Sequence, residues 1–96
     1  MRKYGRTDRN QDAIVSALRK CGASVTSLSA VGGGCPDLLV GFRGRTYVIE
    51  AKVGKNWLTD DQIKWWNEFN GKGFIVNSPE QALVGIGAIN GKQKTS

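Results

Sequence analysis

The chain has 96 residues, enough for one small domain, and it carries a formal net charge of +6. It contains no histidine and only two cysteines, which excludes a zinc site and every mechanism that depends on a histidine base. Any hydrolysis must therefore use carboxylates, a lysine and a metal ion, while the positive charge suits either a nucleic-acid backbone or plain solubility.

The first predicted element is a helix that begins at a cap on Thr7 or Asp8, ends near Cys21 and is terminated by Gly22. Apolar residues recur at helical spacing along this stretch. Residues 1–6, which precede the helix, are basic, and we expect them to form a loose arm.

Two amides, Asn10 and Gln11, each lie four residues before an apolar position of this helix and extend its apolar stripe. One interpretation is ordinary solvation of the start of the helix. The other is that the first turn reaches a catalytic site, and the residues alone leave both interpretations open.

A strand is predicted over residues 23–30, followed by a run of three glycines at positions 32–34. No Gly-Lys-Ser/Thr follows the run, so it is not a P-loop. It is either a flexible loop or a place where the backbone approaches DNA closely.

The centre of the chain predicts a hairpin of two strands, residues 38–42 and 46–51, with Arg43-Gly44 as a two-residue turn. In this register Asp37 faces Glu50 across the two strands. A three-residue turn would instead move Asp37 to the opposite face of the sheet.

Facing carboxylates repel one another in a buried hairpin, and a divalent cation between Asp37 and Glu50 would remove that conflict. Hard oxygen ligands suit Mg²⁺, Mn²⁺ or Ca²⁺. Lys52 lies two residues beyond Glu50 on the same face. In the alternative register, Glu50 and Lys52 would form only an ordinary ion pair.

The residues from Thr59 to Gln62 match a capping box for a second helix, which we expect to run to about Asn70 and to end at Gly71. Gln62 at the end of this box would cap Thr59 reciprocally. Its neighbours Trp65 and Trp66 are expected in the core rather than as platforms for stacking bases.

A short apolar strand is predicted at residues 74–76, and Ser78 with Pro79 begins a third helix. Residues 90–96 form a polar tail. The element order α-β-β-β-α-β-α predicts an α/β (α+β) fold in one domain over residues 1–96, with helices packed on a mixed sheet.

Neither a signal peptide nor a membrane-spanning run is apparent, and two cysteines do not make a disulfide framework. We therefore expect an intracellular protein with reduced thiols and no membrane partner.

The motif Pro36-Asp37, followed by Glu50-Ala51-Lys52, resembles the Pro-Asp…(Asp/Glu)-x-Lys signature of nucleases. A glycine run before Pro36 and the string Leu58-Thr59-Asp60-Asp61-Gln62 after the lysine add to the resemblance. The whole pattern, over about residues 7–83, is similar to the small phage-type VRR-NUC domains of the PD-(D/E)xK nucleases. This resemblance implies a restriction-endonuclease-like core.

The resemblance also implies a divalent-metal-dependent DNA endonuclease. Mg²⁺ or Mn²⁺ would be held by Asp37, Glu50 and the carbonyl of Ala51, and Lys52 would act on the attacking water or on the charged transition state. The site residues so implied, supporting amides included, are Asp37, Glu50, Lys52, Gln62, Asn10 and Gln11. Gln62 thus has two interpretations of equal weight, reciprocal capping of Thr59 or, by this resemblance, an amide that lines the site.

Stand-alone phage members of this family resemble dimeric Holliday-junction resolvases. The resemblance therefore implies a homodimer that cuts four-way DNA junctions in the cytoplasm of a host bacterium, encoded by a phage or prophage. Two alternatives stay open: a basic nucleic-acid-binding module without catalysis, and a nuclease that acts on flaps or single strands.

Overall fold

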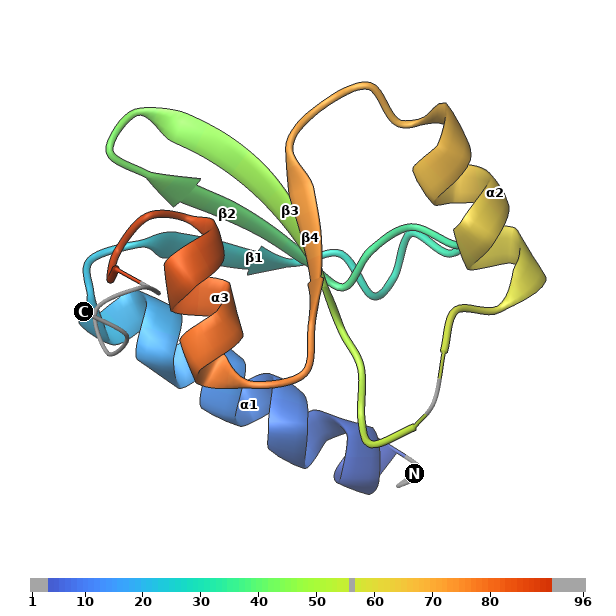
Figure 1. The fold of residues 1–96 in the computed structure, drawn as a ribbon. Coiled ribbons are helices and arrows are strands. Elements are labelled where there is room, and N and C mark those ends of the chain that lie inside the picture. Colours follow the sequence, from blue (N-terminus) through green and yellow to red (C-terminus); the bar gives the residue numbers. More distant parts are fainter. Residues whose placement is uncertain (1–3, 56, 91–96) are drawn as a thin grey trace.

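A computed structural model of the chain describes residues 4–55 and 57–90 and shows one mixed sheet with helices beside it (Figure 1). The elements are α1 (Tyr4–Lys20), β1 (Ser24–Ser27), β2 (Leu38–Phe42), β3 (Arg45–Ala51), α2 (Asp60–Glu68), β4 (Gly73–Val76) and α3 (Pro79–Gly85). The predicted order of elements and the predicted fold class are confirmed. Within the described residues no helix is long and apolar enough to cross a membrane.

The sheet has the strand order β1-β2-β3-β4, in which β4 runs parallel to β3 and the other neighbours are antiparallel. Phe42 pairs with Arg45, so the β2–β3 turn has two residues, Arg43 and Gly44, with φ angles of 52° and 82°. Positive φ at both turn residues matches the right-handed twist of the two strands. The predicted register is confirmed, and the three-residue turn is excluded.

The core lies between the sheet and the pair α1 and α3, which lie together against it in Figure 1. Ile14 and Leu18 of α1 and Val40 of β2 are completely buried. By contrast, α2 stands apart from α1 and α3, and none of its residues is buried. The hydrophobic effect therefore fixes the sheet and two helices firmly, and α2 much less.

Several predicted boundaries were wrong. Helix α1 already begins at Tyr4, so Thr7 and Asp8 lie inside it and do not cap it, because nothing from Tyr4 onward prevents helical φ and ψ angles. Half of the expected basic arm is therefore helical, and residues 1–3 lie outside the described residues. Strand β1 is shorter than residues 23–30, because the chain turns after Leu28, whose carbonyl accepts from the N–H of Val31 at 3.0 Å.

Helix α2 ends at Glu68, and its C-cap residue Phe69 is extended (φ −76°, ψ 129°), so Gly71 is not its terminator. The expectation of core tryptophans was also wrong, since Trp65 and Trp66 are only half-buried. They form a cluster with Phe69, whose ring stacks on that of Trp65 with centroids 4.5 Å apart. The two tryptophans are partly exposed because α2 lies apart from α1 and α3. Residues 91–96, most of the predicted tail, lie outside the described part of the chain.

Candidate active site

Two carboxylates meet where β2 begins and β3 ends. The ladder stops at the pair Leu38–Ile49, and one more step along the same register brings Asp37 opposite Glu50. Side chains of such a pair, which lies between the hydrogen-bonded pairs, come especially close. Asp37 Oδ2 also accepts a 2.8 Å hydrogen bond from the N–H of Ala51, which holds its carboxylate at the strand end.

Glu50 is a buried carboxyl, with 2% of its surface exposed. Burial, and then the charge of Asp37, raise the pKa of Glu50 to about 7, against lowering contributions from Lys52 and Gln62. Its Oε2 accepts a 3.0 Å hydrogen bond from Gln62 and lies 3.6 Å from the Nζ atom of Lys52. Its Oε1 is buried and has no hydrogen-bond partner among the described residues.

The amide of Gln62 links the site to α2. Its Oε1 accepts from the Thr59 N–H at 2.9 Å and from Lys52 Nζ at 3.1 Å, while its Nε2 donates to Glu50. The Gln62 N–H donates in turn to Thr59 Oγ1, which completes the capping box. Both interpretations of Gln62 therefore hold at once. Because two donors meet its oxygen, the nitrogen end of the amide must face Glu50.

The two amides of α1 differ in what they reach. Asn10 Nδ2 donates a 3.0 Å hydrogen bond to the carbonyl of Lys52, and so it fixes the backbone at the end of the site. The side chain of Gln11 makes no hydrogen bond to another described residue. The structure thus brings Asn10 to the site, through the lysine's backbone rather than through its ammonium group, and a role of Gln11 there stays a prediction.

The carbonyl of Ala51 also points into this region. Its N–H is directed at Asp37, and in an extended strand the C=O of a residue lies on the same side as its N–H. Continuing the ladder would place Pro36 opposite Ala51. Proline has no N–H, so the ladder offers this carbonyl no donor.

Together these atoms form a set of hard oxygen donors of the kind that Mg²⁺ and Mn²⁺ prefer: the Asp37 carboxylate, Glu50 Oε1 and the Ala51 carbonyl. The orphaned, buried Oε1 of Glu50 is the observation that fits a cation best. Within the described ranges, no three side chains of Asp, Glu, Cys or His are grouped so that they could hold a metal ion by themselves. Water would therefore complete the coordination, as is usual for Mg²⁺.

Sequence reasoning missed the thiol of Cys35, which lies half-buried beside the site. Burial raises its pKa, and the charges of Glu50 and Asp37 raise it further. Its place directly before Pro36-Asp37 was the available signal. A raised pKa keeps this thiol in its neutral form, which is a poor nucleophile and a poor metal ligand.

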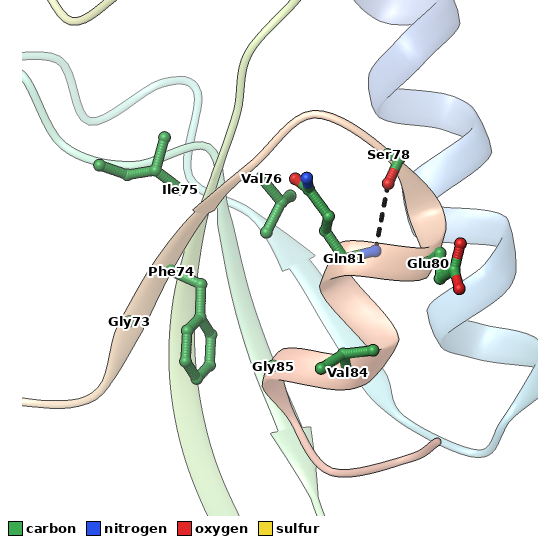
Figure 2. Close-up of a pocket in the computed structure, with 9 residues that line it drawn as sticks. All are labelled: Gly73, Phe74, Ile75, Val76, Ser78, Glu80, Gln81, Val84 and Gly85. Carbon is green, nitrogen blue, oxygen red and sulfur yellow. Dashed lines mark hydrogen bonds between the residues drawn. The ribbon is translucent and has the colours of Figure 1, made fainter. Parts of the chain in front are cut away.

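A groove lies away from the carboxylates, along β4 and α3, and Figure 2 shows the side chains that line it. This open groove has a volume of about 840 Å³. Its lining residues are Gly73, Phe74, Ile75, Val76, Ser78, Glu80, Gln81, Val84 and Gly85. No predicted site residue is among them, and Glu80 is the only charged one, so the carboxylate pair remains the candidate active site.

Among solved structures, the chain is similar to one described as a VRR-NUC domain. The TM-score is 0.68 at 28% sequence identity, and the match covers 80% of this chain and 91% of that one. No family model matches the chain, and neither does any curated protein. The solved relative confirms the resemblance to VRR-NUC domains and supports a nuclease-type fold.

Proposed function

Starting from the VRR-NUC fold of this chain, we propose that it is a divalent-metal-dependent endonuclease that hydrolyses phosphodiester bonds of DNA. The observation that carries the proposal is the buried Glu50, whose Oε1 has no partner among the described residues. A buried, unpartnered carboxylate oxygen beside a second carboxylate is costly unless a cation binds there. A bound cation would offset this cost, so the paired carboxylates support a metal site better than a purely structural role.

In this proposal Asp37, Glu50 and the Ala51 carbonyl hold Mg²⁺ or Mn²⁺. The bound ion supplies a Lewis acid for the phosphate and lowers the pKa of a bound water. Asp37 is kept at its place by the Ala51 N–H, and Glu50 by the amide of Gln62. Held side chains of this kind need little rearrangement during the reaction.

The side chain of Lys52 brings a positive charge to the site. Its ammonium donates to Gln62 and faces Glu50, and 15% of the side chain is exposed. It can stabilise negative charge that develops on the phosphate, or it can position and deprotonate the attacking water. Asn10 fixes the carbonyl of the same residue, so both ends of Lys52 are positioned.

The test is incubation of the pure protein with four-way junction, flap, duplex and single-stranded DNA in Mg²⁺, Mn²⁺ or EDTA. We expect cutting only with a metal, and loss of cutting in Asp37→Asn. Undiminished cutting in EDTA would overturn the metal mechanism. Salt-dependent binding without cutting in any metal would favour the alternative, a nucleic-acid-binding module.

We further propose that two copies of the chain associate and cut four-way junctions, since two matched cuts suit a two-fold dimer. The outer edge of β4, with which no described strand pairs, supports this. The carbonyls of Lys72 and Val76 accept from β3, so the alternate residues Gly73 and Ile75 direct their backbone groups away from β3, beside the groove of Figure 2. An edge of this kind pairs readily with another strand.

The dimer is tested by light scattering at tens of micromolar. We expect the wild type to be a dimer and Ile75→Pro to be a monomer, because proline removes an outward N–H that β3 does not use. A wild-type monomer, with and without DNA, would contradict both the dimer and the junction substrate. A dimer that Ile75→Pro leaves intact would place the interface elsewhere.

A further inference from the structure

The glycine run at positions 32–34 lies in the β1–β2 loop, which in Figure 1 is drawn in teal and reaches across to α2. Its third glycine touches the helix. A Cβ atom added to Gly34 would overlap the carbonyl oxygen of Asp61 and lie 2.6 Å from the carbonyl carbon of that residue. It would also lie 2.9 Å from the backbone nitrogen of Gln62. These are backbone atoms, which cannot rotate away as a side chain can.

Asp61 and Gln62 belong to the first turn of α2, and Gln62 is the residue whose amide bridges Glu50 and Lys52. None of the residues of α2 is buried, so few packing contacts fix the place of this turn. The close approach of Gly34 is one of those few. The contact therefore includes the backbone of a residue whose side chain belongs to the proposed active site.

We propose that Gly34 is a positioning residue: the absence of a side chain at Gly34 seats the first turn of α2 where Gln62 bridges Glu50 and Lys52. Its effect on cleavage rests on the proposed nuclease function, and its effect on Gln62 does not. The bridge that the Gln62 amide forms tolerates little displacement of the helix. Its two hydrogen bonds measure 3.0 and 3.1 Å, and a shift of about 1 Å takes both beyond hydrogen-bonding distance.

The test compares Gly34→Ala with Gly32→Ala. Both glycines have positive φ angles, 85° and 76°, so alanine brings similar backbone strain to each. Around Gly32, however, an added Cβ meets no atom within 4 Å. The difference between the two variants therefore isolates the contact with α2. We expect Gly34→Ala to lower kcat by about 100-fold with little change in DNA affinity, and Gly32→Ala to change neither much.

A second readout needs no activity. In the metal-free protein, the side-chain NH₂ signals of Gln62 in a ¹H–¹⁵N NMR spectrum report its hydrogen bond to Glu50. We expect these signals to move in Gly34→Ala toward those of a solvent-exposed glutamine, and to stay in place in Gly32→Ala. If the wild type cuts no DNA, the nuclease proposal fails, and this spectrum still decides the role of Gly34.

A double-mutant cycle of Gly34→Ala and Gln62→Ala gives a third readout. In a Gln62→Ala background, Gly34→Ala should lower the rate little further, because the two changes act on one bridge. Fully additive effects would overturn the proposal, as would unchanged Gln62 signals in Gly34→Ala. Since α2 buries no residue, we expect Gly34→Ala to remain folded by circular dichroism. An unfolded Gly34→Ala beside a folded Gly32→Ala would assign Gly34 to support of the fold and would also overturn the proposal.

Discussion

Glu50 lies opposite Asp37 at the end of the β2–β3 hairpin, and burial together with the Asp37 charge raises the pKa of Glu50 to about 7. The unfolded chain has no such neighbour, and its glutamate titrates near its ordinary pKa of 4.5. Between these two values the folded protein binds more protons than the unfolded chain. The stability of the metal-free protein should therefore fall as pH rises from about 4.5 through about 7 and then level off.

Glu50→Gln removes this dependence, because glutamine does not titrate. In EDTA at pH 7 to 8 we expect Glu50→Gln to be more stable than the wild type by about 1–3 kcal/mol. At acid pH, where Glu50 is protonated, the two proteins should be similar. Urea unfolding across the pH range measures this, and a wild-type stability that rises over the window would contradict the arrangement of the two carboxyls.

Asp37 both repels Glu50 and accepts a hydrogen bond from Ala51, and two substitutions separate these effects. Asp37→Asn keeps an oxygen for the Ala51 N–H and removes the charge, so in EDTA at neutral pH it should gain about 1 kcal/mol. Asp37→Ala also loses the acceptor, which costs about 1–3 kcal/mol. Thermal melting should therefore rank Asp37→Asn above the wild type and Asp37→Ala below Asp37→Asn.

Added Mg²⁺ extends the same experiment. A ligand that binds only the folded state stabilises it by mass action. We expect Mg²⁺ to raise the melting temperature of the wild type in a concentration-dependent way, and that of Asp37→Asn much less. Equal shifts in both proteins would show that Mg²⁺ acts away from Asp37.

The two functions of Gln62 can be separated in the same way. Thr59→Ala removes the cap and should lower stability by about 0.5–2 kcal/mol with little change in cleavage rate. Gln62→Glu retains a capping-box residue but replaces the donor to Glu50 with a negative charge. The cap is kept, but in EDTA the added charge beside Glu50 should lower stability by about 1 kcal/mol, and the cleavage rate should fall at least about tenfold. Equal rates in the two variants would reduce Gln62 to a cap.

Local signals were enough to predict the hairpin register and the α2 cap. Gly44 allows a two-residue turn, and the spacing from Thr59 to Gln62 fits one turn of a helix. The opposed positions of Asp37 and Glu50 therefore followed from short-range geometry, because the turn sets which residues of the hairpin face each other. The start of α1 could not be predicted from local signals, since the residues before Thr7 are also compatible with a helix.

Long-range contacts could not be predicted from these local signals. Nothing local to Gly34 indicates that it touches α2, and nothing near Trp66 indicates that its helix stands away from the core. The bond from Asn10 to the Lys52 carbonyl joins residues 42 positions apart. Such contacts depend on how whole elements pack, which periodicity and capping do not encode.

Lys52 can act in the proposed reaction either as a fixed cation or as a base. Its ammonium donates to the Gln62 oxygen and faces Glu50, an environment that suits a fixed cation. We therefore expect Lys52 to stabilise charge on the phosphate rather than to remove a proton from water. Lys52→Ala should keep DNA binding and lose most of the cleavage rate. Lys52→Arg keeps the charge but cannot act as a base, because arginine stays protonated in proteins.

Single-turnover rates of the wild type, Lys52→Ala and Lys52→Arg, measured from pH 6 to 10, decide between the two roles. A cationic stabiliser predicts that Lys52→Arg is faster than Lys52→Ala by at least about tenfold, which is about 1.4 kcal/mol of transition-state stabilisation. A general base predicts that both variants are equally slow, since neither supplies a free amine. Near wild-type rates in Lys52→Ala would leave the lysine as no more than the ion-pair partner of Glu50.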